Sequence, residues 1–260
     1  LTRTAQFVAE TCNLSVPAHH PYTGASAFAH KGGLHASAIA RFPEAYEHTS
    51  PRNVGNATRM LVSELAGKAS LAAKAKSLGI DLSDDARTLQ AILDDVKARE
   101  AHGYSYEVAD GSLAVLIRRH LGTYEPHFRL ESFRVIVDDR EDTGALAKDA
   151  ASEATVKIHV GDRRIVATGE GTGPVGALDA ALRMAITEYL PEVANMELTD
   201  YKVRILDEEG AGTSATTRVI ITTSDKRGSW GTVGVSENII EASWNALVDS
   251  IEYGLIRAKG

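Results

Sequence analysis

The C-terminal half of the chain contains an internal repeat with a shift of 65 residues. In each copy, segments with alternating apolar and polar residues predict strands, and an apolar pattern at helical spacing follows them. The matched helix positions are Val175, Ala177, Ala181, Leu182, Ile186 and Leu190 in the first copy and Ile240, Ala242, Ala246, Leu247, Ile251 and Leu255 in the second. A three-stranded sheet cannot bury its apolar face alone, so each helix should cover one sheet. Two βββα units with antiparallel sheets are therefore predicted for residues 127–260.

The residues before the repeat follow a different pattern. Between residues 51 and 122 the apolar side chains recur at helical spacing, as at Leu89, Ile92, Leu93 and Val96. The glycines expected to end successive helices are Gly79, Gly103 and Gly122. The predicted fold class is α+β, with a tail at residues 1–50, a helical connector at 51–126 and a domain of two βββα units at 127–260.

Composition excludes several classes of partner. The net charge is −7, and acidic and basic residues are interspersed along the chain without a basic block, which argues against nucleic acid or an anionic membrane as partner. The chain has one cysteine, Cys12, which fits a reducing cytoplasm. No apolar run is long enough to span a membrane, and the N-terminus has no secretory signal pattern. A cytoplasmic protein is expected.

A glycine motif lies between the last strand and the helix of the first copy. Gly171, Gly173 and Gly176 form the pattern G-x-G-x-x-G, which is typical of dinucleotide-binding turns. That interpretation needs a parallel βαβ unit, whereas hairpin-spaced strands precede these glycines. The second copy has Ser236, Asn238 and Glu241 at the corresponding positions. The repeat therefore disfavours dinucleotide binding.

Two histidines flank a glycine pair in the segment Phe-Ala-His-Lys-Gly-Gly-Leu-His at residues 28–35. His30 or His35 could act as a general acid or base, because a histidine titrates near neutral pH. Both could equally be structural residues of a glycine turn. Their spacing of five residues fits no common metal-ligand pattern.

Several segments resemble the citramalate synthase and 2-isopropylmalate synthase family. The segment at 28–35 is the most specific of them. Ser-Pro-Arg-Asn-Val-Gly-Asn at 50–56, Leu-Val-Ser-Glu-Leu-Ala-Gly-Lys at 61–68 and Gly-Tyr-Ser-Tyr-Glu at 103–107 resemble the citramalate synthase branch in particular. The resemblance extends over essentially the whole chain.

The resemblance implies a reaction that this segment cannot perform alone. Family members condense acetyl-CoA with a 2-oxo acid in a (β/α)₈ barrel that holds a divalent metal. Such a barrel takes roughly 250 residues, so the barrel and its metal are expected outside this segment, which itself holds no cofactor. By resemblance, His35 enters the active site of the partner subunit and assists proton removal from the acetyl methyl group. His30 occupies a motif position of less defined role.

The resemblance also implies regulation. The family's C-terminal domain dimerises and binds leucine or isoleucine, the end product of the pathway. The implied effector-binding residues are Gly171, Thr172, Gly173, Gly176, Gly212, Thr213, Ala215 and Thr216. Free N–H groups at a helix start suit a carboxylate, and missing side chains leave room for a branched aliphatic group. Alternatively, these glycines serve only close packing of helix on sheet.

The expected function is the connector and regulatory region of a homodimeric acyltransferase of branched-chain amino acid biosynthesis. The parent enzyme would convert acetyl-CoA and pyruvate to citramalate and would be inhibited by isoleucine or leucine. Two alternatives stay open. One is a 2-isopropylmalate or homocitrate synthase of the same family. The other is a stand-alone amino-acid-binding dimerisation module, which would have no use for the histidine segment.

Overall fold

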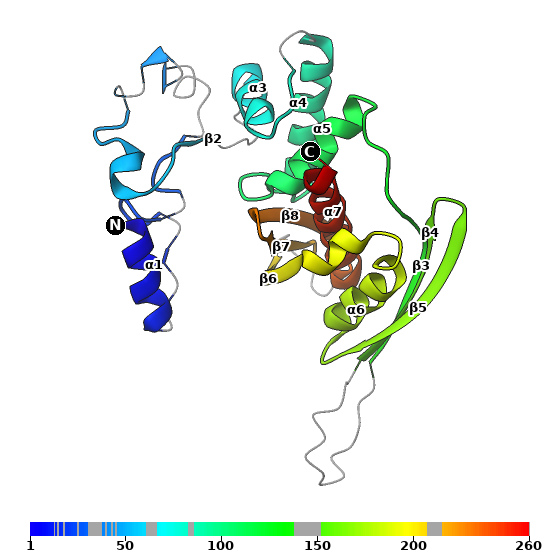
Figure 1. Ribbon diagram of the computed structural model, residues 1–260. Coiled ribbons are helices and arrows are strands. Elements are labelled where there is room, and N and C mark those ends of the chain that lie inside the picture. Colours follow the sequence, from blue (N-terminus) through cyan, green and yellow to red (C-terminus); the bar gives the residue numbers. More distant parts are fainter. Residues whose placement is uncertain are drawn as a thin grey trace. The chain divides into compact units, whose positions relative to one another are not determined.

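A computed structural model describes residues 1–260 except 13, 15, 18, 25, 31–37, 40, 43, 45, 61–66, 83–85, 138–151, 207–214 and 260. The chain divides into two compact units, Leu1–Ala101 and His102–Gly260 (Figure 1). The division falls within residues 51–126, which the sequence pattern groups as one connector. None of the helices in the described ranges is long and apolar enough to cross a lipid bilayer.

The first unit is mainly helical. Its elements are α1 (Thr2–Thr11), β1 (Ala29–His30), the 3-10 helix η2 (Pro51–Val54), β2 (Arg59–Met60), α3 (Lys68–Ser77) and α4 (Ala86–Ala101). Strands β1 and β2 pair in parallel, and α3 packs against α4. The four apolar residues at helical spacing, Leu89, Ile92, Leu93 and Val96, are all buried on α4. Gly79 after α3 and Gly103 after α4 have left-handed backbones, as their role in ending helices requires.

The second unit confirms the two predicted βββα repeats. Its elements are α5 (Asp110–His120), β3 (Arg129–Val137), β4 (Ser152–Val160), β5 (Arg163–Gly171), α6 (Pro174–Ile186), η3 (Pro191–Asn195), β6 (Glu197–Ile205), β7 (Thr217–Asp225), β8 (Gly228–Ser236) and α7 (Ile239–Lys259). The strand orders are β3-β4-β5 and β6-β7-β8, antiparallel throughout. Helix α6 covers the first sheet and α7 the second (Figure 1).

The structure extends the repeat from the helices to all three strands. Strands β4 and β5 map onto β7 and β8 with the same shift of 65, whereas β3 maps onto β6 with a shift of 68. The register shift in β3, between Leu130 and Ser132, recurs in β6 between Leu198 and Asp200. Leu190, which the repeat predicts as a helix position, lies outside α6, because this helix ends at Ile186. Pro191 disfavours helical geometry at the residue before it.

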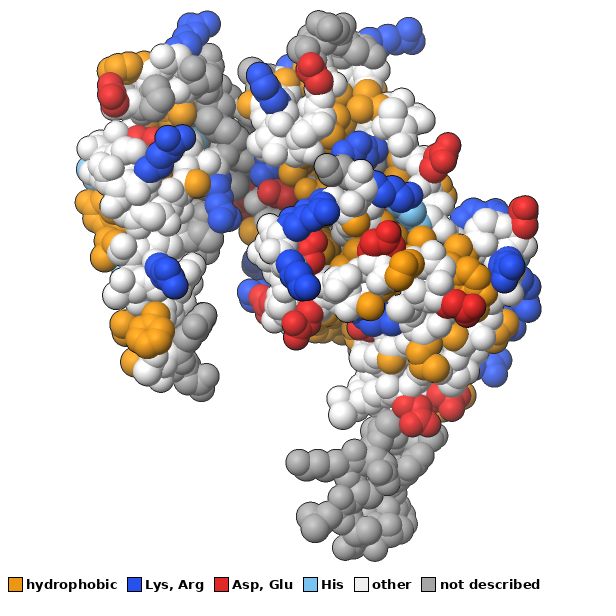
Figure 2. Space-filling model, viewed as in Figure 1, with side chains coloured by type: hydrophobic (Ala, Val, Ile, Leu, Met, Phe, Trp, Pro, Cys, Tyr) orange, Lys and Arg blue, Asp and Glu red, His pale blue; other side chains and the backbone are white. Residues whose placement is uncertain are grey.

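The two repeats share one hydrophobic core. Ala154, Val156 and Ile158 of β4 pack under α6 in the same buried cluster as Trp230, Trp244 and Ile251 of the second repeat. The Phe133 and Trp244 rings are 5.4 Å apart, which joins the first sheet to α7. On the face of the second unit that Figure 2 shows, Lys and Arg side chains are interspersed with Asp and Glu.

Small residues at the repeated positions let each helix lie close to its sheet. A Cβ atom added to Gly169 on β5 would be 2.3 Å from the backbone nitrogen of Ala181 on α6. A Cβ atom on Gly234, the counterpart of Gly169 on β8, would be 1.9 Å from the carbonyl oxygen of Ala242 on α7. The backbones therefore touch at these points, which explains the matched alanines on both helices.

We expect Gly169→Ala to lower the free energy of unfolding by about 1–3 kcal/mol or more, because helix and sheet backbones must move apart. Gly176→Ala is the matched control. A Cβ atom there meets no atom within 4 Å, and alanine favours the helix by about 1 kcal/mol over glycine. Urea denaturation of both variants measures the difference. Equal stabilities would contradict close packing at Gly169.

Candidate functional site

His30 lies at the end of β1 with a carboxylate partner. Its Nε2 atom is 3.3 Å from Oε1 of Glu47, and Thr58 Oγ1 donates to the same oxygen at 2.6 Å. The His30 and Glu47 side chains are only 11% and 6% exposed. The Tyr46 ring meets the His30 ring edge-on at a centroid distance of 6.5 Å. Pairing of β1 with β2 holds Thr58 beside the histidine.

The carboxylate fixes the orientation of the imidazole. A neutral ring that donates its Nε2 proton to Glu47 leaves Nδ1 as an acceptor. Sequence spacing did not reveal this partner, because Glu47 is 17 residues from His30 and next to it only in the fold. His35 lies outside the described residues, so its catalytic role stays a prediction.

The glycine turn before α6 divides into two kinds of position. A Cβ atom on Gly171 would lie 2.5 Å from the backbone nitrogen of Ala177, so close packing accounts for this glycine. A Cβ atom on Gly173 or Gly176 would meet nothing within 4 Å. Packing therefore explains Gly171 but neither of the others. Thr172, between them, is exposed.

The starts of the two repeated helices differ in their polar groups. Gly173 caps α6 without a side chain, and Pro174 follows it. Helix geometry leaves the N–H groups of Val175 and Gly176 without intrahelical acceptors. Since a helix N-terminus carries partial positive charge, this turn favours an anion.

The start of α7 carries its own polar side chains. Asn238 Oδ1 accepts from the N–H of Ile240 at 2.9 Å, and Ser236 Oγ accepts from the N–H of Asn238 at 3.1 Å. Ser236 also donates to Glu241 at 2.8 Å, which places a carboxylate beside this helix start. The glycines of the first repeat thus stand where the second repeat supplies its own acceptors.

The predicted loop of the second repeat is described only in part. Gly212 and Thr213 lie outside the described residues, whereas Ala215 and Thr216 are half-buried just before β7. The carbonyl of Thr216 accepts from the N–H of Leu206 at 2.9 Å. Its methyl group would be 3.4 Å from a Cβ atom on Gly103. The base of the loop is thus closed by backbone pairing and adjoins Gly103.

Val175 connects the first turn of α6 to the second repeat. Its side chain packs against the buried cluster that contains Val219, Ala246 and Leu247. Leu198 and Tyr201 of β6 pack against the same cluster. The first turn of α6 is therefore joined through Val175 to the core of the repeat that carries Ala215 and Thr216.

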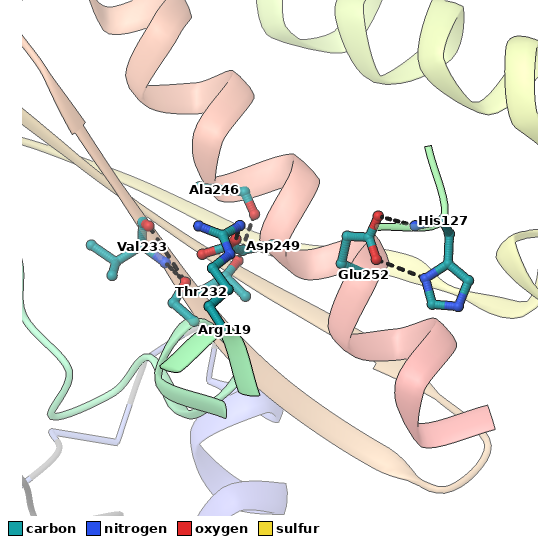
Figure 3. Close-up of polar contacts among 8 residues, drawn as sticks. Arg119, His127, Thr232, Val233, Ala246, Asp249 and Glu252 are labelled. Atoms are coloured by element: carbon teal, nitrogen blue, oxygen red, sulfur yellow. Dashed lines mark hydrogen bonds and ion pairs between the residues drawn. The ribbon is translucent and has the colours of Figure 1, made fainter. Parts of the chain in front are cut away.

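Helix α5 closes the outer edge of β8 (Figure 3). Ser112 Oγ accepts from the N–H of Val233 at 3.0 Å and lies 3.4 Å from the carbonyl oxygen of the same residue. From within β8, Thr232 donates to the Ala246 carbonyl of α7 at 2.8 Å. Because β8 is an edge strand, Ser112 satisfies backbone groups that would otherwise face solvent or another chain.

The segment between α5 and β3 is attached to α7 through a buried carboxylate. Glu252 is fully buried and accepts from the backbone N–H of His127 at 2.9 Å and from its Nδ1 at 2.7 Å (Figure 3). The Nε2 atom of His127 is 2.8 Å from Nζ of Lys259. A lysine ammonium can only donate, so the imidazole is neutral with its proton on Nδ1. Nothing in the sequence indicates this pair, whose members are 125 residues apart.

The structure is a domain of two βββα repeats preceded by helices, and one family model matches each of these parts. Residues 107–255 match the LeuA allosteric (dimerisation) domain. Residues 22–103 match the homocitrate synthase post-HMGL domain-like family. Within the described residues, no group of three or more His, Cys, Asp or Glu side chains could hold a metal ion.

The chain belongs to the citramalate synthase and 2-isopropylmalate synthase family, which confirms the resemblance seen in its motifs. It is 52% identical to the (R)-citramalate synthase of Streptomyces coelicolor over 260 residues, 99% of this chain and 47% of that protein. It is 46% identical to the (R)-citramalate synthase of Aquifex aeolicus over 257 residues, 99% of this chain and 48% of that protein.

A more distant relative is the 2-isopropylmalate synthase of Cronobacter sakazakii, 28% identical over 250 residues, 95% of this chain and 43% of that protein. The chain spans about half the length of the curated relatives it matches.

Tyr124 gives a pH-dependent test of the α5–β3 segment. Burial, together with the charge of Glu252, raises the pKa of Tyr124 to about 12. The pKa in the unfolded chain is about 10, so the neutral phenol stabilises the fold below pH 10 and this contribution is lost as the pH rises toward 12. We expect the free energy of unfolding to fall more steeply over this range in the wild type than in Tyr124→Phe. Urea denaturation at several pH values measures both slopes, and equal slopes would contradict the burial of the phenol beside Glu252.

Proposed function

We propose that this chain is the connector and regulatory region of an acyltransferase that condenses acetyl-CoA with pyruvate to form citramalate. The glycine turn at the start of α6, whose cap Gly173 has no side chain, within a domain of an allosteric family, is the observation that carries the regulatory part. Pyruvate is favoured because the chain is 46–52% identical to several proteins named (R)-citramalate synthase and 28% identical to a 2-isopropylmalate synthase.

The effector is isoleucine or leucine, bound at the start of α6. Its carboxylate accepts hydrogen bonds from the N–H groups of Val175 and Gly176, where the helix dipole favours negative charge. Gly173 and Gly176 leave the space for the ligand, since no atom lies within 4 Å of a Cβ built on either. The branched side chain would lie toward Val175, which follows the turn and packs against the same buried cluster as Leu198 and Tyr201.

The functional form is a homodimer. The match to an allosteric dimerisation domain supports this proposal. Large apolar side chains exposed on the second unit, among them Met184 on α6 and Ile205 on β6, are 66% and 64% exposed. Isolated residues of this kind are common on protein surfaces, so the dimer proposal rests on the family match.

Catalysis belongs to the longer protein, with a divalent metal in a barrel that this segment does not contain. His35 would assist proton removal from the acetyl group in the partner subunit's active site. His30, oriented by Glu47, would be its neighbour in the motif. A stand-alone amino-acid-binding module is less favoured, because the match to (R)-citramalate synthases includes the histidine segment and covers 98–99% of this chain.

We expect isothermal titration calorimetry to detect binding of isoleucine or leucine to the wild-type chain. Gly173→Val should weaken binding at least about tenfold, because its side chain fills the space beside the free N–H groups. Gly67→Val is the matched control, since Gly67 caps α3 and a Cβ atom there also meets nothing within 4 Å. No heat with any branched-chain amino acid would argue against the effector site.

We expect His35→Ala in the full-length protein to lower kcat about 10²–10⁴-fold, the usual contribution of a general acid or base. The change in KM should be smaller, because the imidazole acts in the chemical step. His19→Ala is the control, since His19 is exposed. Unchanged kcat would assign a structural role to His35.

A further inference from the structure

We propose that α7 transmits effector binding to the connector, and that the contact between Glu252 and His127 is the latch through which it does so. This inference rests on the proposed function, because it concerns regulation by the amino acid bound at the start of α6.

Helix α7 contacts both ends of the coupling. It is a single helix of 21 residues, which corresponds to about 30 Å at 1.5 Å per residue. Ala246 and Leu247 on its N-terminal half belong to the cluster against which Val175 packs beside the glycine turn. Glu252, further along, holds His127. A helix moves as a rigid rod, so displacement at its first half is carried to the latch.

The repeat shows that the latch is not a requirement of the βββα fold. The counterpart of Glu252 in the first repeat is Thr187, just after the end of α6, and the counterpart of Asp249 is Met184, which is 66% exposed. In the described part of the chain, the main packing partners of α5 are β8 and α7, both from the second repeat. The acidic residues therefore occur on the helix that packs against α5.

The latch is a demanding contact, because a fully buried carboxylate loses its hydration. Two donors from one residue, the backbone N–H and Nδ1 of His127, replace the lost water, and Lys259 fixes the tautomer that allows this. Removing one partner of a buried charged contact is far more disruptive than losing an exposed one. A partly formed contact would leave the carboxylate buried without its donors, so Glu252 and His127 are either in contact or apart. Such a pair has the two discrete arrangements that allosteric coupling requires.

The connector is fixed to the same rod at a second point. Arg119 Nη2 lies 3.4 Å from Oδ1 of Asp249, one turn before Glu252, and the guanidinium lies 5.0 Å from the centre of the Tyr124 ring. Together with Ser112 on β8, these contacts tie α5 and residues 121–128 to the second repeat. Residues 102–109 join α5 directly to the end of α4, so the chain passes from the latch into the first unit.

The test separates effector binding from effector response. Glu252→Gln keeps the side-chain shape but sets an amide N–H against one of the two His127 donors. In the full-length protein we expect the calorimetric Kd for isoleucine or leucine to stay within about threefold of wild type. The fold-inhibition, which is the ratio of activity without effector to activity at saturating effector, should fall at least about tenfold. The reason is that an effector inhibits only if it binds one conformational state more tightly than the other. Glu188→Gln, an exposed change near the end of α6, should keep wild-type inhibition.

A second variant controls for loss of stability in Glu252→Gln. The double substitution His127→Leu with Glu252→Leu replaces the buried polar pair by apolar side chains, an exchange that often preserves stability. It should also bind the effector and fail to respond. Wild-type inhibition in either folded variant overturns the latch and leaves the effector site intact. No binding of any branched-chain amino acid to the wild type overturns the effector site, and the latch with it.

Discussion

The architecture of the second unit depends on how closely each helix approaches its sheet. Glycines on β5 and β8 put strand backbone against helix backbone, with added Cβ atoms at Gly169 and Gly234 only 2.3 and 1.9 Å from the facing helix. Alanines on the helices complete the contact. This spacing allows Trp230 and Trp244 to join both repeats in one buried cluster. Without close approach the two repeats would be separate small sheets, each too small to be stable alone.

The same constraint explains which helix positions the two repeats share. The alanines and leucines that pack on the sheets, such as Ala181 and Leu182 in the first repeat and Ala246 and Leu247 in the second, are matched, whereas other positions differ between the two helices. At the start, α7 uses Asn238 as its cap and α6 has Gly173. At the end, α7 continues to Lys259 and holds His127, whereas α6 stops at Ile186 before Pro191. One duplicated scaffold thus provides an open helix start in one copy and an attachment point in the other.

Much of this fold could be predicted from sequence, because the spacing of apolar residues and the internal repeat both indicate which side chains are buried. The shift of 65 residues carried by Leu182 and Leu247 is maintained by the packing of each helix on its sheet. The contacts that give the molecule its chemistry could not be predicted in this way. Glu47 meets His30 across 17 residues, and Glu252 meets His127 across 125. A polar pair has no periodicity, so only the folded chain brings its members together.

The closed edge of β8 has a consequence for how the regulatory region can be isolated. The N–H and carbonyl groups of Val233 face Ser112 of α5, although α5 precedes the repeat in the chain and belongs to the connector by sequence pattern. A fragment that begins at residue 127, where the alternating pattern starts, would lack this helix and expose a strand edge, which invites pairing between molecules. The autonomous folding domain therefore begins before Asp110. Helix α5 covers the edge of β8 and so prevents this strand from pairing with another molecule.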